Sequence, residues 1–475
     1  MNFTDALPED INDIVTASQT AFLAYRKLPL QRRVGFMHKI AELLEEDADR
    51  LIEAAARETH LPEMRLRSEL ARTRWQLTSY ADAAAKGEHL QVRIDPANAS
   101  TVPPQPDIRK MMVPLGPVAV FGAANFPFAY STAGGDTASA LAAGCTVIVK
   151  AHPAHAETSQ LVANCIEKAA LATEMPLGTF QHLHGSSHEV GRALIEHPLL
   201  KAVGFTGSLA GGRQLFDWAM ARPAPIPVFA EMSSINPIFL MPEKLQAEPE
   251  ELARLIAASI TLGVGQFCTN PGLLIAPKMP ALARFRQTLA EAIEKDTPAE
   301  MLHTGIFQNY VERRANTLAQ SDLELLANAG AEPLYNQGVA TIAVTSGQQF
   351  LSNPLLHQEV FGPFSLLVEC EDMQEMLLVA QHIEGQLTAT LMATDGDLER
   401  YPLFLETAID MAGRVIRNGV PTGVAVCQSQ MHGGPYPATT DSRFTAVGAD
   451  ALLRFLRPVA FQNWTAPWLP EPLRG

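Results

Sequence analysis

The first ninety residues are patterned as helices. Hydrophobic residues recur there with a period of about 3.6, and charged residues such as Glu45, Glu46 and Arg50 fill the positions between them. This pattern predicts two amphipathic helices across residues 9–58, broken near Leu28-Pro29, and a third from about residue 62 to 86. The clearest hydrophobic positions are Ile40, Leu43, Leu44, Leu51 and Ile52.

The stretch 88–113 differs in composition. Prolines are frequent in it and just after it, and only short extended pieces separate them. Because proline interrupts helices and sheet ladders, we expect an exposed hairpin or arm rather than core. The prolines are Pro96, Pro103, Pro104, Pro106 and Pro114.

From residue 114 the chain alternates apolar, β-branched strands with helices. Such alternation predicts a parallel sheet covered on both faces, and such sheets bind ligands beyond the carboxyl ends of their strands. We expect strands at 118–121, 146–149, near 180, at 202–203 and at 227–229, with helices at 131–143, 156–171 and 209–221.

A second α/β series begins near residue 250. A chain of 475 residues is too long for one core, so two or three domains are expected. The predicted helices are 250–262, 280–295 and 308–329, and the predicted strands are 273–276, 340–345, 364–369, 387–393, 413–417 and a last one at 457–463.

Composition narrows the class of protein. No apolar run approaches the ~18 residues of a membrane span, and the net charge of −15 argues against nucleic acid as a partner. The five scattered cysteines favour reduced thiols and a cytoplasmic protein, and nothing has the ligand spacing of a metal site. The first residues lack a basic and an apolar region, so we do not expect export.

One cysteine lies in an unusual setting. Cys268 falls within Thr261–Gly272, a stretch of turn and loop residues that follows a helical run. A single cysteine is more often packing than nucleophile, but here backbone N–H groups could be left free to bind an anion. Cys268 is therefore a candidate nucleophile if other residues support it.

Further candidates follow the predicted strands of the first series. Lys150 ends one strand and could meet a phosphate or a ribose hydroxyl, or could simply be a solvated lysine. Another strand leads into the glycine-rich turn 205–212, where Gly207, Ser208 and Gly211 open a helix whose N-terminus suits a pyrophosphate. The turn does not have the G-x-G-x-x-G spacing, so by itself it is a weak signal.

Two other polar residues come directly after strands. Asn125, in Asn125-Phe126-Pro127, could donate its amide to an oxyanion or could merely form a turn. Glu231 could be a general base or a residue beside a helix cap.

Taken together, the motifs resemble the NAD(P)-dependent aldehyde dehydrogenases over essentially the whole chain. The resemblance rests on Asn125-Phe126-Pro127, Val149-Lys150, Phe205-Thr206-Gly207-Ser208, Glu231, Gly265-Gln266-Phe267-Cys268, Glu359-Val360-Phe361-Gly362-Pro363 and Asn418-Gly419, in this order. It implies an α/β fold with two Rossmann-like parallel-sheet domains and a small oligomerisation arm. Residues 1–90 and 114–231 would bind the cofactor, and residues 232–450 would form the catalytic domain. The segments 91–113 and 455–475 would be the arm and tail of a homodimer or homotetramer.

The resemblance also implies roles. Cys268 would attack an aldehyde carbonyl, Asn125 and the Cys268 backbone N–H would hold the oxyanion, and Glu231 would activate water to hydrolyse the thioester. Lys150 would serve both catalysis and the cofactor ribose. Gly207, Ser208 and Gly211 would face the pyrophosphate, and Glu359 with Phe361 would hold the nicotinamide ribose.

Two departures from the family pattern affect these expectations. The family's E-L-G-G-K segment is here Glu231-Met232-Ser233-Ser234-Ile235, which puts backbone flexibility near the base in doubt. Pro153 stands where NAD-preferring members often carry a glutamate, and losing that carboxylate removes repulsion against a 2′-phosphate. We therefore expect NADP, with NAD possible, and assistance from His152, His155 or Arg192.

The substrate is suggested by a narrower resemblance. Stretches 134–141, 150–155, 433–439 and 457–459 resemble the α-ketoglutaric semialdehyde (2,5-dioxopentanoate, or 2,5-dioxovalerate) dehydrogenases and the NADP-dependent fatty aldehyde dehydrogenases. A substrate carboxylate would need a cation, for which Arg72 is the candidate, although it could be a solvated helix residue. Phe128 and Asn418 are further substrate candidates.

Three other functions are less well supported. A CoA-acylating enzyme would not need Glu231, and a silent structural or binding protein would have lost Glu231 or Cys268. A cysteine hydrolase would pair the cysteine with histidine, but no histidine lies near Cys268 in the sequence, although a distant one could fold against it.

Overall fold

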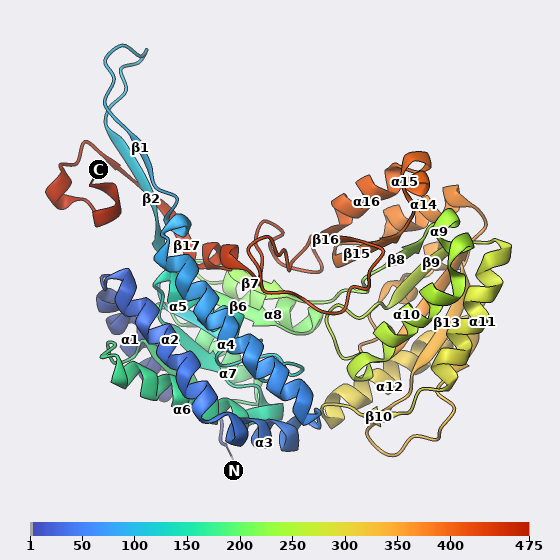
Figure 1. Ribbon diagram of the computed structural model, residues 1–475. Coiled ribbons are helices and arrows are strands. Elements are labelled where there is room, and N and C mark those ends of the chain that lie inside the picture. Colours follow the sequence, from blue (N-terminus) through green and yellow to red (C-terminus); the bar gives the residue numbers. More distant parts are fainter. Residues whose placement is uncertain (1–2, 475) are drawn as a thin grey trace.

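The computed structural model describes residues 3–474 and consists of two lobes and a projecting arm (Figure 1). The lobe at the left of Figure 1 is built around a five-stranded sheet and the other around a seven-stranded sheet. The chain passes from the first sheet to the second between β7, which ends at Glu231, and β8, which begins at Ile238. The domain boundary proposed near residue 231 falls in this connection.

The five-stranded sheet is entirely parallel. Its order is β5-β4-β3-β6-β7, with bounds Phe180–Leu183, Val147–Lys150, Val118–Phe121, Ala202–Thr206 and Val228–Glu231. Alternate residues of β3 and β4 pack on opposite faces: Val120 and Val149 join the core beneath α5 (Gly135–Ala143) and α6 (Ala156–Ala172). Ala119 and Ile148 join the core that includes α1 (Pro8–Tyr25), α7 (His188–Glu196) and α8 (Leu209–Met220). The predicted strands are confirmed; helix α7 was not expected.

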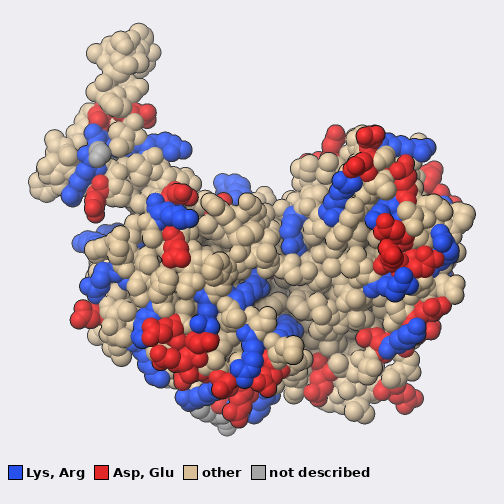
Figure 2. All heavy atoms as spheres, viewed as in Figure 1, with Lys and Arg blue, Asp and Glu red and all other residues tan. Residues whose placement is uncertain are grey.

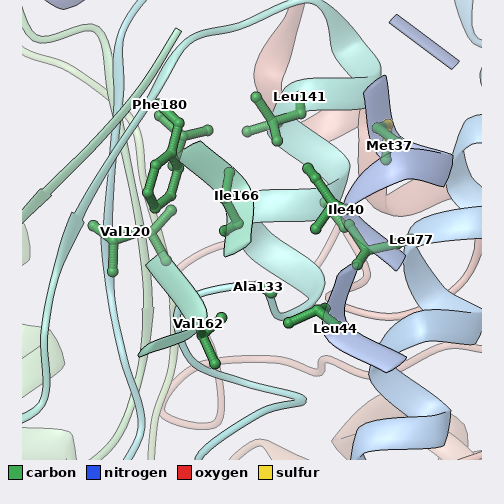
Figure 3. Close-up of a cluster of buried hydrophobic side chains, with 14 of the residues drawn as sticks. Met37, Ile40, Leu44, Leu77, Val120, Ala133, Leu141, Val162, Ile166 and Phe180 are labelled. Carbon is green, nitrogen blue, oxygen red and sulfur yellow. The ribbon is translucent and has the colours of Figure 1, made fainter. Parts of the chain in front are cut away.

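Residues 8–59 form three helices, α1, α2 and α3, where two were predicted across residues 9–58. A break at Asp47 separates α2 (Leu30–Glu46) from α3 (Ala48–Thr59), after which α4 covers Glu63–Ala85. Asp47 lies outside helical geometry, which turns the chain so that α3 packs against both α4 and α6. Figure 3 shows how Ile40 and Leu44 of α2 meet Leu77 of α4 and Ile166 of α6.

The seven-stranded sheet has the order β11-β13-β14-β9-β8-β15-β16. It is parallel except for β11, which runs antiparallel to β13. The strands are Glu324–Asn328, Thr341–Ser346, Phe364–Cys370, Leu273–Pro277, Ile238–Leu240, Gln386–Met392 and Ala412–Arg417. The helices of this lobe are α9 (Pro242–Ala247), α10 (Pro249–Thr261), α11 (Pro280–Glu294), α12 (Thr304–Leu318), α13 (Gly347–Ser352), α14 (Met373–His382), α15 (Asp395–Arg400) and α16 (Leu403–Met411).

The helix predicted at 308–329 is wrong over its second half. Helix α12 ends at Leu318, the chain turns at Asp322 in the left-handed region, and Glu324–Asn328 becomes the edge strand β11. The exposed edge of the sheet offers this segment hydrogen-bond partners on β13, and the periodicity of the segment gave no sign of them.

The arm and the tail form one small antiparallel sheet of order β1-β2-β17. Strand β2 (Ile108–Pro114) pairs on one side with β1 (Arg93–Asp95) and on the other with β17 (Leu456–Gln462). The proline-rich tip at 96–106 carries no charged residue and extends away from both lobes (Figures 1 and 2). This confirms the predicted hairpin and final strand.

Candidate active site

The loop that carries Cys268 is held in an unusual backbone conformation. After α10 ends, Gly263, Val264 and Gly265 all adopt positive φ angles of 57–63°. A β-branched residue such as Val264 rarely adopts this geometry. A Cβ atom on Gly265 would lie 2.3 Å from the carbonyl carbon of Gly362, so only glycine lets these two segments touch.

The backbone carbonyl of Cys268 is held by a hydrogen bond from Asn236, and its sulfur lies near His432. The Asn236 amide donates hydrogen bonds of 2.9 Å to the Cys268 and Asn270 carbonyls, which sets the path of the loop. The Cys268 Sγ lies 3.7 Å from Nε2 of His432 and is partly exposed. The thiol therefore faces an imidazole and stays within reach of a small molecule.

Glu231 is the last residue of β7 and is almost fully buried. His432 is buried too, and its Nε2 lies 3.1 Å from one carboxylate oxygen of Glu231 and 3.0 Å from the other. One residue after β7 ends, the Met232 N–H donates to the Ala438 carbonyl, which anchors the chain beside Glu231. Cys268, His432 and Glu231 thus form one cluster, hereafter the catalytic cluster, whose reactive atoms all lie within 4.8 Å of one another.

The surroundings shift the pKa values of Cys268 and Glu231 in opposite directions. Burial, and then the negative charge of Glu231, raises the pKa of the Cys268 thiol well above its usual value. Burial also favours the protonated form of Glu231, but the charge of His432 and its hydrogen bond outweigh it and lower the pKa of that carboxyl. In this state the cluster holds a carboxylate beside a thiol, so a proton acceptor must act before the sulfur can attack.

Sequence reasoning did not identify His432. It lies 164 residues after Cys268, in the loop that follows β16, and only the packing of this loop brings it to the sulfur. The motif noted at 433–439 begins one residue later, so the position was close to a recognised signal. A histidine beside Cys268 also removes one reason given above against a cysteine hydrolase.

Asn125 follows β3 and lies beside the nucleophile loop. Its amide nitrogen donates to the Gln266 carbonyl at 3.2 Å, two residues before Cys268, and the side chain is buried. Its backbone carbonyl accepts from the Arg65 guanidinium at 2.9 Å. An amide nitrogen carries two hydrogens, so one hydrogen bond to Gln266 leaves a donor for an oxyanion.

The predicted phosphate and ribose region has open backbone and an unpaired cation. Gly207 and Ser208 are exposed at the start of α8, where the Ser208 hydroxyl accepts from the Gly211 N–H at 3.2 Å and leaves other N–H groups outward. Lys150, at the end of β4, has no carboxylate within ion-pair distance among residues 3–474, and burial lowers its pKa. These features fit a dinucleotide cofactor, with Lys150 on a ribose and the turn on the pyrophosphate.

Pro153 and the residues predicted to assist a 2′-phosphate differ in how exposed they are and in whether they already have a partner. Pro153 is exposed and His152 partly exposed. His155 is fully buried, and its Nε2 lies 2.8 Å from the Ala123 carbonyl, so the prediction that it could assist a 2′-phosphate is wrong. Arg192 is exposed and paired with Glu196.

A small cleft lies between the nucleophile loop and the Glu359–Pro363 segment. Glu359 and Phe361 line it together with Gly265 and Phe267. The Ser233 hydroxyl donates to Glu359 at 2.9 Å, and burial raises the pKa of this carboxyl to about 7. Ser233, one of the departures from the family pattern, thus ties the segment after Glu231 to the predicted nicotinamide-ribose residue.

Of the three predicted substrate residues, only Arg72 lies beside the catalytic cluster. It projects from α4, donates to the Tyr130 hydroxyl at 3.2 Å, and acts electrostatically on Cys268. The Tyr130 ring lies between, with its centroid 6.0 Å from that of His432. Arg72 is therefore not a solvated helix residue, and its Nε has no hydrogen-bond partner among the described residues.

Phe128 and Asn418 occupy other positions. Phe128 is 1% exposed and packs in the core of the first lobe, so its predicted substrate contact is wrong; Phe126 is the ring that meets Tyr130 and Phe267. The Asn418 amide exchanges two hydrogen bonds with the backbone of Ala393, so its substrate role stays a prediction without further support.

Two more arginines, Arg65 and Arg414, lie near the nucleophile loop or act on Cys268. Arg65 lies over the rings of Phe126 and Phe267, and Arg414 of β16 acts electrostatically on Cys268 and Tyr130. Each has one buried guanidinium nitrogen with no partner among residues 3–474. Figure 2 shows basic side chains gathered where the surface is hollowed between the lobes.

The match to a family model and the named relatives identify the chain as an NAD(P)-dependent oxidoreductase. More particularly, the chain belongs to the aldehyde dehydrogenase family, whose model matches residues 1–436. The resemblance stated from the motifs is confirmed.

Known proteins agree with this assignment. The chain is 44% identical to an alpha-ketoglutaric semialdehyde dehydrogenase from Acinetobacter baylyi and 46% identical to alpha-ketoglutaric semialdehyde dehydrogenase 2 from Azospirillum brasilense. Each match covers 99% of this chain and 90% of the relative. A 1-pyrroline-5-carboxylate dehydrogenase from Thermus with bound NAD shares the fold, with a TM-score of 0.82 at 20% identity over 96% of this chain and 86% of that one. Among the described residues, no helix is long and apolar enough to cross a membrane.

Proposed function

We propose that this enzyme oxidises α-ketoglutaric semialdehyde (2,5-dioxopentanoate) to 2-oxoglutarate. The observation that carries this proposal is the partly buried Arg72, linked through Tyr130 to the catalytic cluster. The two relatives that share 44–46% of the sequence bear the name of this activity. A substrate with an aldehyde at one end and a carboxylate at the other would suit a site in which the Arg72 guanidinium acts electrostatically on the Cys268 thiol.

In the first half-reaction, a neutral His432 with its ring proton on Nδ1 would accept the proton of Cys268 at Nε2 while the sulfur bonds to the aldehyde carbon. The carbonyl oxygen becomes an oxyanion, held by the Asn125 amide and the Cys268 N–H. The bound cofactor supplies the acceptor for the hydride that leaves this carbon with its electron pair. What remains on Cys268 is a thioester.

In the second half-reaction, Glu231 would remove a proton from water as the water oxygen attacks the thioester. The carbon–sulfur bond then breaks, and the protonated His432 returns its proton to the departing sulfur. The carboxylic acid product and Glu231 release one proton each to solvent. The cluster is then ready for another substrate.

For the cofactor we propose a preference for NADP, with NAD also used. Family membership supports NAD(P). Pro153 is exposed and uncharged, so it would not repel a 2′-phosphate bound next to it. Lys150 would hold the ribose, and the partly exposed His152 is the remaining histidine that could meet a 2′-phosphate. The turn at Gly207, Ser208 and Gly211 would bind the pyrophosphate, and Glu359 with Phe361 the nicotinamide ribose.

Oligomerisation is proposed from the arm. Strand β17 leaves one edge of the small sheet unpaired among residues 3–474, and such an edge favours pairing with another strand. We propose a homodimer or homotetramer built through the arm and tail, which the molar mass in solution would test.

The five free cysteines support a cytoplasmic location.

A fatty aldehyde dehydrogenase is the second candidate function. Phe126, Phe267 and Tyr130 form an aromatic group beside the cluster that would suit an alkyl chain. The two candidates differ in one measurable way, because only the semialdehyde carries a charge for Arg72 to bind.

The test compares 2,5-dioxopentanoate with pentanal, a neutral aldehyde of equal length, in wild type and in Arg72→Ala. A hydrogen-bonded charge pair contributes roughly 1.5–3 kcal/mol, so kcat/KM for the charged substrate should fall by about 10- to 150-fold. Pentanal should be affected far less. Arg67→Ala is the matched control, because Arg67 lies on the same helix and pairs at the surface with Asp49 and Glu63.

Equal losses for both aldehydes would remove Arg72 from the role. A wild-type preference for long alkyl aldehydes over the semialdehyde would replace the proposed substrate by the fatty aldehyde alternative.

A further inference from the structure

We propose that the catalytic cluster is also a binding site for Zn²⁺, and that occupation of this site reversibly blocks the enzyme. Among residues 3–474, Glu231, Cys268 and His432 are the only three such side chains whose ligand atoms converge in this way. No ligand spacing in the sequence predicted this site, because the three residues come from separate segments of the chain.

The distances within the cluster fit a tetrahedral ion. With Zn–S near 2.3 Å and Zn–N and Zn–O near 2.1 Å, tetrahedral angles require about 3.6 Å between sulfur and nitrogen and about 3.4 Å between nitrogen and oxygen. The Cys268 Sγ lies 3.7 Å from the His432 Nε2, which in turn lies 3.0–3.1 Å from the Glu231 oxygens. Small side-chain rotations would therefore complete the coordination.

The chemistry of the ligands selects the kind of ion. Thiolate and imidazole favour a borderline-soft cation such as Zn²⁺ over Mg²⁺ or Ca²⁺, which take oxygen ligands. Glu231 and a thiolate at Cys268 would repel each other in a buried site, and a divalent cation between them removes this repulsion. Arg72 and Arg454 act on the same two groups and oppose any cation, so binding must come from the metal–sulfur and metal–nitrogen bonds rather than from charge alone.

Zinc should inhibit the enzyme because it binds the sulfur of Cys268, the proposed nucleophile. Zinc forms its bond with the lone pair that would otherwise attack the aldehyde, and it engages the proton acceptor and the general base at the same time. In this respect the site differs from a catalytic zinc site, where three protein ligands leave the nucleophile to a bound water. Removal of the ion by a chelator should restore activity completely.

The experiment titrates the metal-free full chain with Co²⁺, whose bond to a thiolate gives a charge-transfer absorption band. We expect one ion per chain in wild type and no band in Cys268→Ser. His432→Ala and Glu231→Gln should each weaken binding by at least ~10- to 100-fold. Cys427→Ser is the matched control for adventitious binding, because Cys427 is the exposed free cysteine, and this variant should keep the band.

A second readout guards against variants that fold poorly. In wild type, Zn²⁺ should protect Cys268 from alkylation, measured by mass spectrometry of the labelled peptide, and Glu231→Gln should lose this protection while keeping its circular dichroism. Persistence of the band in Cys268→Ser, its loss in Cys427→Ser, or unchanged affinity in both His432→Ala and Glu231→Gln would overturn the proposal. An active dehydrogenase without the band would contradict this inference alone, whereas an inactive protein with the band would contradict the proposed function alone.

Discussion

Replacement of His432 by glutamine gives the most direct test of how the thiol is activated. Glutamine can still hydrogen-bond to Glu231, but it cannot accept the Cys268 proton at neutral pH. General acid–base groups contribute roughly 10²- to 10⁴-fold. The 3.7 Å separation of Sγ and Nε2 is longer than a short hydrogen bond, and Glu231 offers a second acceptor, so we expect the lower end of that range. The acylation rate should fall by ~10²-fold, which corresponds to about 2.7 kcal/mol in the barrier.

The assay is a stopped-flow measurement of reduced cofactor in the first turnover, with cofactor affinity measured separately by fluorescence. His432→Gln should slow the burst and leave cofactor affinity unchanged, because His432 lies on the catalytic cluster rather than at Lys150 or the 207–211 turn. A burst rate within about threefold of wild type, a difference of only ~0.65 kcal/mol, would refute the role assigned to His432.

Four further outcomes are expected. Glu231→Gln should give a burst of reduced cofactor and then stall as thioester; unimpaired steady-state turnover would mean that another base activates the water. Pro153→Glu should move the NADP/NAD ratio of kcat/KM toward NAD through repulsion of the 2′-phosphate, and Pro153→Ala, which adds no charge, should not; equal ratios in both variants would contradict this. Gly265→Ala should abolish activity and lower the melting temperature, since its Cβ would lie 2.3 Å from the Gly362 backbone; a variant with wild-type stability would show that the loop can move. Glu359→Gln tests the raised pKa of about 7: folding penalises the carboxylate, so wild type loses stability as the pH rises from about 4.5 through 7. The loss is at most about 3 kcal/mol and smaller for a partly exposed group. Glu359→Gln should therefore raise the melting temperature at pH ~8 but not at pH ~5, and an equal change at both would refute the shift.

The layered α/β architecture and many of the candidate site residues could be predicted from the sequence. Strands with apolar, β-branched residues alternate with helices from residue 118 onward, and this pattern survives in both sheets. Lys150 and Glu231 could be placed because both come at the carboxyl ends of parallel strands, which meet at one edge of the sheet. Loop composition made Cys268 a candidate, and the order of the other motifs along the chain supported it.

The tertiary structure alone decided which residues complete the site. His432 reaches Cys268 across 164 residues through a loop without periodic pattern, so no local signal could place it there. The choice between Phe126 and Phe128 depends on which ring turns into the core, and both rings follow the same turn. The edge strand at 324–328 likewise depends on β13 as its neighbour, and such partners exist only once the sheet has formed. Periodicity and motifs record what each segment prefers alone, whereas contacts between distant segments depend on how the whole chain packs.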